Sequence, residues 1–138
     1  MSIERELLQR YRTLAVVGIS NEPSRPAYWV SEYMHQQGYR IIPVNPLERE
    51  VFGVPCYPDL RSIPEPVQFV NVFRRPQFCA EVAEEAVAIG AEVLWLQLGI
   101  VAPAARRIAE AAGLVYVEDR CVLAEHRRHA LGRMGPSE

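Results

Sequence analysis

Residues 14–30, LAVVGISNEPSRPAYWV, begin with an apolar run that stops at Gly18. A polar loop punctuated by prolines follows, and then apolar residues recur at helical spacing. This order predicts a buried strand, a loop and a helix, which is how a nucleotide-binding unit begins. Because the second and third glycines of the dinucleotide-binding fingerprint are absent, the stretch does not favour NAD as a ligand.

The same alternation of strand and helix continues along the chain. We predict strands at residues 13–19, 40–45, 67–73, 92–99 and 114–119. We predict helices at residues 3–11, 26–37, 76–89, 103–112 and 122–130, with a short helical turn at 59–63 inside the proline-rich connection 46–66. Near-continuous apolar strands that alternate with helices indicate parallel βαβ units.

These elements predict an α/β fold, namely a Rossmann-like, doubly wound, mainly parallel five-stranded sheet with helices on both faces. With the strands numbered along the chain, we expect the order 3-2-1-4-5. The ligand crevice of such a sheet lies at the carboxyl ends of the strands where the order reverses, which here is between strands 1 and 4.

Composition narrows the class of protein. The net charge is −2, so a basic surface for nucleic acid is not expected, and 49% of the residues are hydrophobic, as in a folded domain. No apolar run is long enough for a membrane span, and the first residues do not resemble a secretion signal. We expect one cytoplasmic domain over residues 1–130 and a loose tail over 131–138. Protein partners and oligomeric state stay open.

Few residues suggest catalysis or metal binding. Cys56, Cys79 and Cys121 lie far apart without metal or redox spacing, and all fifteen basic side chains are arginines, so no Schiff-base or P-loop lysine exists. Cys121 follows an Asp–Arg pair, and we weigh a reactive thiol that pairs with a ligand thiol against a small packed side chain. We expect no catalytic residue and no metal site.

Several other side chains are interpreted as structural. His126 and His129 share one helical face among arginines, which favours a solvated basic face over a metal site. Glu84 and Glu85 are also interpreted as a solvated face. Trp29 recurs at helical spacing with apolar neighbours, which predicts a core position.

Polar and cationic residues follow every predicted strand end. The residues at and just past these ends are Gly18, Ser20, Asn21, Ser24, Arg25 and Pro26 for the first strand, Asn45 and Pro46 for the second, Arg74 and Arg75 for the third, Gln97, Leu98 and Gly99 for the fourth, and Asp119, Arg120 and Cys121 for the fifth. A helix amino end with hydroxyls and an arginine suits phosphate. The second strand ends at Asn45, where an NAD site needs an acid.

Five segments carry a family resemblance: VVGISNEPSRPAYWV, YRIIPVNP, VNVFRRP, LWLQLGI and VEDRC. In this order and spacing they resemble the small stand-alone CoA-binding proteins, whose fold is that of the CoA-binding domain of the succinyl-CoA synthetase alpha subunit. The resemblance covers about residues 8–126.

The resemblance implies where coenzyme A would lie. The loop from Gly18 to Arg25 would wrap the pyrophosphate, and the end of the second strand would border the adenosine. The third and fourth strand ends would hold adenine and pantetheine. The implied binding residues are Gly18, Ile19, Ser20, Asn21, Ser24, Arg25, Pro26, Val44, Asn45, Pro46, Val72, Phe73, Arg74, Gln97, Leu98, Gly99, Arg120 and Cys121. Arg25 and Arg74 are both candidates for the 3′-phosphate.

The implied function is binding of coenzyme A or a short acyl-CoA without catalytic machinery, as a carrier, sensor or accessory subunit. The synthetase has a second domain with a phosphorylated histidine and a nucleotide-binding partner, so we expect no ligase activity from these residues alone. Three alternatives remain: a ligase component completed by another chain, a small NAD-linked reductase, and a scaffold that has lost its ligand.

Overall fold

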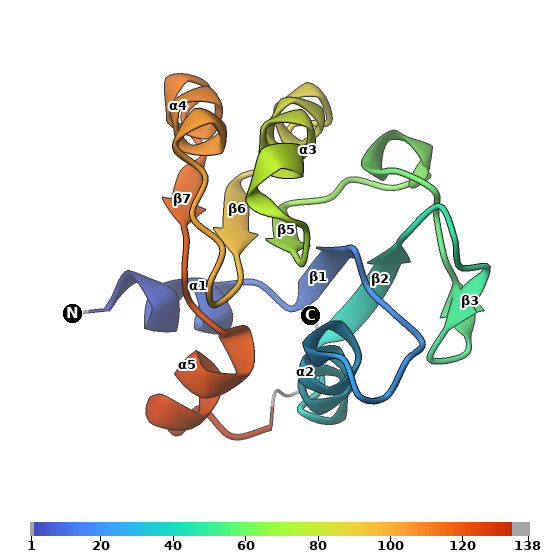
Figure 1. The fold of residues 1–138 in the computed structure, drawn as a ribbon. Coiled ribbons are helices and arrows are strands. Elements are labelled where there is room, and N and C mark those ends of the chain that lie inside the picture. Colours follow the sequence, from blue (N-terminus) through green and yellow to red (C-terminus); the bar gives the residue numbers. More distant parts are fainter. Residues whose placement is uncertain (1, 134–138) are drawn as a thin grey trace.

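The central element of the structure, a computed structural model that describes residues 2–133, is a parallel sheet of five short apolar strands (Figure 1). Its strands are β1 (Thr13–Val17), β2 (Arg40–Val44), β5 (Phe69–Val72), β6 (Val93–Leu96) and β7 (Val115–Val117). Every residue of β5 and β6 is buried, which fits the apolar sequence of β6 and that of β5 apart from Asn71. The predicted α/β class is confirmed.

Helices cover both faces of this sheet (Figure 1). They are α1 (Ile3–Arg10), α2 (Pro26–Gln36), α3 (Pro76–Ala88), α4 (Pro103–Ala111) and α5 (Val122–Arg128), with a 3₁₀ turn η1 at Leu60–Ser62. The helices α3 and α4 cover one face, while α1, α2 and α5 cover the other. The helices α2, α3 and α4 each begin at a proline, whose fixed φ suits the first helical position.

A small hairpin lies inside the proline-rich connection, where no strand was predicted. It consists of β3 (Glu50–Val51) and β4 (Val54–Pro55), which pair antiparallel. The two residues between them, Phe52 and Gly53, have positive φ angles of 53° and 76°. Such a turn matches the twist of a tight hairpin, and glycine at its second position is the signal that the sequence carried.

The predicted strand order is wrong. The observed order is β2-β1-β5-β6-β7, which is 2-1-3-4-5 in the predicted numbering. The outer edge of β2 is closed to a further strand, because Pro43 has no N–H and its carbonyl accepts a hydrogen bond from Tyr57 N at 3.0 Å. The third predicted strand, β5, therefore pairs with the free edge of β1, as Val17 opposite Val72 shows.

This correction moves the expected ligand crevice. The strand order reverses between β1 and β5, since the connection after β1 leads to β2 on one side and β5 lies on the other. The observed order is the second common arrangement of doubly wound sheets, and the same rule places the crevice at its reversal point. The site is thus expected between β1 and β5 instead of between the first and fourth predicted strands.

His126 is buried, contrary to the predicted solvated face. Its side chain is 1% exposed, and its Nε2 donates to the carbonyl of Gly132 at 2.7 Å. In the neutral imidazole, Nδ1 then accepts from the hydroxyl of Tyr33 at 2.8 Å. These bonds join α5 to α2 and to a residue of the expected tail. The neighbouring His129 is 18% exposed and lies 3.6 Å from Glu125, while residues 134–138 of the expected tail lie outside the described part.

Replacing His126 with alanine is expected to lower the free energy of unfolding by about 2 kcal/mol, because two buried hydrogen bonds of about 1 kcal/mol each are lost. Urea denaturation followed by circular dichroism measures the change. His35→Ala is the matched control, because His35 is exposed and makes only a stacked contact with Phe52. Equal losses in the two variants would contradict the role given to His126.

No helix within residues 2–133 is long and apolar enough to cross a membrane.

Candidate functional site

The ends of three neighbouring strands meet at Gly18. Gly18 N donates to the carbonyl of Val44 at 2.9 Å, and Phe73 N donates to the carbonyl of Val17 at 2.8 Å. Gly18 has a φ of 87°, and a Cβ atom on it would lie 2.2 Å from the carbonyl oxygen of Phe73. The chain can therefore turn out of β1 beside β5 only with glycine at this position.

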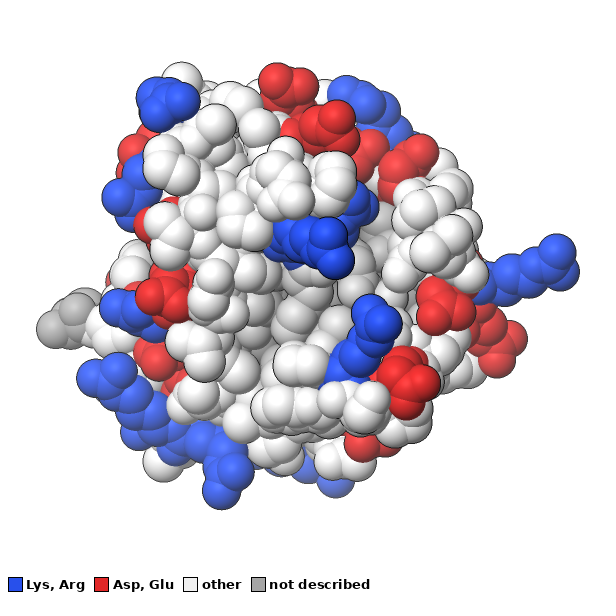
Figure 2. Space-filling model, viewed as in Figure 1, with Lys and Arg blue, Asp and Glu red and all other residues white. Residues whose placement is uncertain are grey.

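A groove of about 640 Å³ opens at this meeting point. Figure 2 shows a hollow at the centre of this face, with positively charged side chains on two sides of it. Its lining comes from the loop after β1, the first turn of α2, and the segments that follow β5, β6 and β7. The lining residues are Gly18, Ser20, Arg25, Pro26, Ala27, Trp29, Val30, Phe73, Arg74, Arg75, Pro76, Gln97, Leu98, Ile100 and Cys121.

Three arginines of the groove have no carboxylate partner within the described residues. They are Arg25, Arg74 and Arg75, and the guanidinium of Arg74 instead lies 4.6 Å from the centre of the Phe78 ring. Unpaired guanidinium groups around a hollow produce a strong positive potential. This part of the groove is therefore suited to a multiply charged anion.

Two helix amino ends add to this potential. Arg25 precedes α2 and Arg75 precedes α3, and neither side chain caps its helix. In contrast, Ser2 caps α1 and Asp59 caps η1 by accepting backbone N–H bonds. Pro26 and Pro76 have no N–H, and Tyr28 N and Phe78 N donate to the carbonyls of Arg25 and Arg75, so the positive partial charge of these two helix ends rests mainly on the N–H groups of Ala27 and Gln77.

The loop after β1 is held mainly by its own side chains. Ser20 Oγ accepts from Glu22 N at 2.9 Å, and the hydroxyl of Ser24 donates to the Glu22 carboxylate at 3.3 Å. Asn21 is bound to the hairpin side, since its backbone N and its Nδ2 both donate to Glu48 at 3.1 Å. The amide of Asn21 is thus already engaged away from the groove, whereas Ser20 lines it.

Four residues implied by the resemblance have structural roles at the strand ends. The side chain of Ile19 is fully buried, and its carbonyl accepts from Asn45 Nδ2 at 2.7 Å. Asn45 Oδ1 also accepts from Leu47 N at 2.8 Å, so this amide fastens the end of β2 to the loop after β1. Val44 and Val72 are core residues, 2% and 0% exposed, which shape the floor.

A second hollow of about 720 Å³ adjoins the groove on the α3 side. The two share Gly18, Phe73 and Arg74, and the second is also lined by Asn45 and Pro46. Together they form a continuous path across the switch point between β1 and β5. An extended ligand can therefore cross the sheet edge at Gly18.

Glu85, one of the acids that line this second hollow, does not lie on a solvated face as predicted. Glu84 is exposed as predicted, but Glu85 accepts from Leu60 N at 3.1 Å and lies 3.8 Å from Arg61. Glu85 therefore holds η1 against α3 instead of forming a solvated face. Helical spacing placed Glu85 on an outer face of α3, but the connection 46–68 folds back over that face.

The segments after β6 and β7 are tied together beneath the groove. Gln97 is 3% exposed; its Nε2 donates to Asn71 Oδ1, and its Oε1 accepts from Val122 N at 3.3 Å. Gly99 N donates to Asp119 Oδ1 at 2.7 Å, which fastens the exposed Leu98–Gly99 loop to the end of β7. These hydrogen bonds fix the position of the loop that carries Leu98.

Arg120 and Cys121 differ in placement. The guanidinium of Arg120 is exposed and donates to the carbonyl of Asp119 at 2.7 Å, outside the groove lining. Cys121 precedes α5, is half-buried and lines the groove. Cys79 is fully buried, and burial raises the pKa of its thiol to about 11, which fits a packing role.

Trp29 lies in the groove, contrary to the predicted core position. Its side chain is 45% exposed, one helical turn after Arg25. Sequence reasoning did not identify Ile100 or Pro76 as lining residues either. The spacing of four residues between Arg25 and Trp29 is the signal that places both on one helical face.

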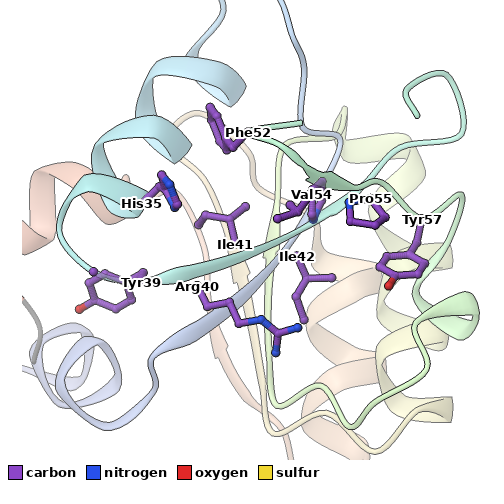
Figure 3. Close-up of a pocket in the computed structure, with 11 residues that line it drawn as sticks. His35, Tyr39, Arg40, Ile41, Ile42, Phe52, Val54, Pro55 and Tyr57 are labelled. Atoms are coloured by element: carbon purple, nitrogen blue, oxygen red, sulfur yellow. The ribbon is translucent and has the colours of Figure 1, made fainter. Parts of the chain in front are cut away.

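A further hollow of about 410 Å³ lies on the far side of β2 (Figure 3). It runs between the outer edge of β2 and the β3–β4 hairpin, with His35 and Phe52 at one end and Tyr57 at the other. The only arginine lining it, Arg40, is paired with Glu65. The lining therefore offers no unpaired charge for a ligand, and the groove at Gly18 is the better candidate site.

Comparison with known proteins identifies the family. A family model described as a CoA binding domain matches residues 12–127. The chain belongs to this CoA-binding domain family. The resemblance expected from the five sequence segments is thereby confirmed.

Relatives of this CoA-binding domain include small proteins of the same length. It is 40% identical to the uncharacterized protein YneT of Bacillus subtilis over 122 residues, which are 88% of this chain and 90% of YneT. It superposes with a TM-score of 0.88 on a hypothetical protein from Pyrococcus horikoshii OT3, with 40% identity over 91% of this chain and 88% of that one.

A ligase subunit is a more distant relative. The chain is 37% identical over 62 residues to the alpha subunit of ADP-forming acetate–CoA ligase II of Pyrococcus furiosus. The matched stretch covers 44% of this chain and 14% of that subunit. The CoA-binding domain is therefore related to part of a ligase subunit.

Proposed function

We propose that this chain binds coenzyme A, or a short acyl-CoA, along the groove that crosses Gly18. The observation that carries the proposal is the set of three arginines without carboxylate partners within residues 2–133, Arg25, Arg74 and Arg75, at the meeting point of two uncapped helix amino ends. Coenzyme A carries a pyrophosphate and a 3′-phosphate, and this cationic region suits both. Membership of the CoA-binding domain family supports the choice of ligand.

The shape of the site suggests an arrangement of the ligand. Its pyrophosphate lies at Arg25 and the amino end of α2, beside Gly18, Ser20 and Pro26. Its adenosine lies in the second hollow, against Asn45 and Pro46. Arg74 borders both hollows, so we assign the 3′-phosphate to Arg74. The pantetheine arm then follows Gln97, Leu98 and Gly99 toward Cys121.

The groove lining supports binding more directly than catalysis. Its charged members are arginines, which remain protonated at neutral pH and do not act as general bases. We propose that the chain carries, senses or hands over the coenzyme. An NAD-linked reductase has less support, because Asn45 stands where an acid would bind the ribose and its amide is already bonded to Ile19 and Leu47.

A role as one component of an acyl-CoA ligase is the second candidate. The similarity to the alpha subunit of the Pyrococcus furiosus ligase favours it. In that case the groove would present coenzyme A to catalytic groups on another polypeptide. Because both candidate functions require binding of coenzyme A, a measurement of that binding tests both of them.

Coenzyme A is expected to raise the free energy of unfolding by about 2.7 kcal/mol when its concentration is one hundred times its Kd, because it binds only the folded chain. Urea titrations with coenzyme A, NAD and ATP measure the effect. NAD and ATP serve as controls and are expected to change stability much less. A shift with NAD alone would favour the reductase, and no shift with any nucleotide would favour a scaffold without a ligand.

A further inference from the structure

The groove has a cationic end and an apolar end. The three arginines surround Gly18 at the ends of β1 and β5. Leu98 and Ile100 follow β6, which lies two strands from β1, a separation of about 10 Å at ordinary strand spacing. Trp29 and Val30 face the same groove one turn into α2. The arginines thus lie at the ends of β1 and β5 and before α2 and α3, whereas Leu98 and Ile100 lie beyond β6.

The polar groups at the apolar end are already engaged. The amide of Gln97 bonds to Asn71 and to Val122 N, and the carboxylate of Asp119 accepts from Gly99 N. The remaining polar group of the lining at this end is the thiol of Cys121, a weak hydrogen-bonding group. Apart from the arginines, the side chains that line the groove therefore offer no cation to a carboxylate or a further phosphate.

Large apolar side chains are left in contact with water at this end. Trp29 is 45% exposed and Leu98 is 70% exposed, although both line a hollow. Exposed apolar side chains that line a hollow beside a polar region are typical of binding sites. An apolar group placed between them would remove this surface from water and would be stabilised in proportion to the area covered.

We infer that the β6–β7 end of the groove binds a short apolar acyl group, carried as a thioester of coenzyme A, against Trp29 and Leu98. The inference rests on the proposed function, because the coenzyme's phosphates must occupy the arginines for the acyl group to reach this end. A thioester is uncharged and needs no ionic partner. An acyl group that ends in a carboxylate would lose its hydration beside Trp29 without gaining a partner.

Isothermal titration calorimetry with three ligands tests the inference. Butyryl-CoA and succinyl-CoA both carry four-carbon acyl groups, which end in a methyl group and a carboxylate respectively, and coenzyme A carries none. Butyryl-CoA is expected to bind about tenfold tighter than coenzyme A, because part of its alkyl chain is removed from water. Succinyl-CoA is expected to bind no tighter than coenzyme A.

Two variants separate the acyl contact from the rest of the site. Trp29→Ala is expected to lower the ratio of the butyryl-CoA and coenzyme A affinities from about tenfold to about one, because the alkyl chain loses its contact. Leu98→Arg places a cation at the apolar end and is expected to make succinyl-CoA the tighter ligand of the pair. Leu98 is 70% exposed, so this substitution leaves the core unchanged.

The control adds the same charge elsewhere. Val54→Arg lies on the β3–β4 hairpin, where Val54 is 37% exposed and does not line the groove, and it is expected to leave the order of the three affinities unchanged. Equal affinities of the natural chain for butyryl-CoA and coenzyme A would overturn the inference, as would an equal loss of both in Trp29→Ala. Neither of these results would contradict the binding of coenzyme A. If none of the three ligands bound, the proposed function itself would be wrong.

Discussion

Gly18→Ala is expected to lower the free energy of unfolding by about 4 kcal/mol. The backbone at Gly18 has a φ of 87°, which costs an alanine energy wherever it occurs. The added Cβ would also lie 2.2 Å from the carbonyl oxygen of Phe73, a backbone atom that cannot move without breaking the pairing of β1 with β5.

Urea denaturation of Gly18→Ala and Gly113→Ala separates these two costs. Gly113 has a φ of 83°, nearly that of Gly18, but nothing lies within 4 Å of a Cβ placed on it. Its replacement is expected to cost about 1.5 kcal/mol, from backbone strain alone. Similar losses in the two variants would show that β1 and β5 do not approach each other as closely as described.

The double variant Arg25→Ala/Arg74→Ala is expected to bind coenzyme A about a thousandfold more weakly, because each charge-assisted hydrogen bond to phosphate contributes about 2 kcal/mol. Calorimetry with coenzyme A and with dephospho-CoA measures the loss. Among the single variants, Arg74→Ala should lose the preference for coenzyme A over dephospho-CoA. Arg25→Ala should weaken both ligands by the same factor, since the pyrophosphate is common to both.

The control for the double variant removes two charges of the same kind elsewhere. Arg106 and Arg107 lie on α4, outside the groove lining, and Arg106 stands 5.2 Å from the centre of the Tyr116 ring. Their replacement with alanine makes the same change in net charge and is expected to alter affinity by less than about threefold, since distant exposed charges are screened by salt. A loss as large as that of the groove variant would mean that overall charge, and no specific contact, binds the phosphates.

Local signals in the sequence determined the elements and their class. Prolines 26, 76 and 103 begin helices, and apolar runs such as Val93–Leu96 form buried strands, as predicted. These properties depend on a few neighbouring residues, because φ restriction and the period of apolar residues act over one or two turns. The prediction that polar residues lie together at one edge of the sheet followed from the parallel direction of the strands, because the carboxyl ends of parallel strands lie at the same edge.

The β3–β4 hairpin was not predicted from local sequence signals. Its strands are two residues long, too short for an alternating pattern, and its signal was the dipeptide Phe52–Gly53. The proline-rich composition around it favoured a loop. Because this hairpin and Tyr57 lie against the outer edge of β2, the missed element also decided the strand order.

By itself, then, the sequence determined the strands, the helices and the glycine that ends the first strand. The tertiary structure alone decided that β5 lies beside β1, that Trp29 faces a groove and that His126 is enclosed. The physical reason is that the period of a helix or strand defines which residues share a face, whereas the neighbour that covers this face comes from distant parts of the chain. Pro43 closes one edge of the sheet, α5 with Gly132 covers His126, and no described segment covers Trp29.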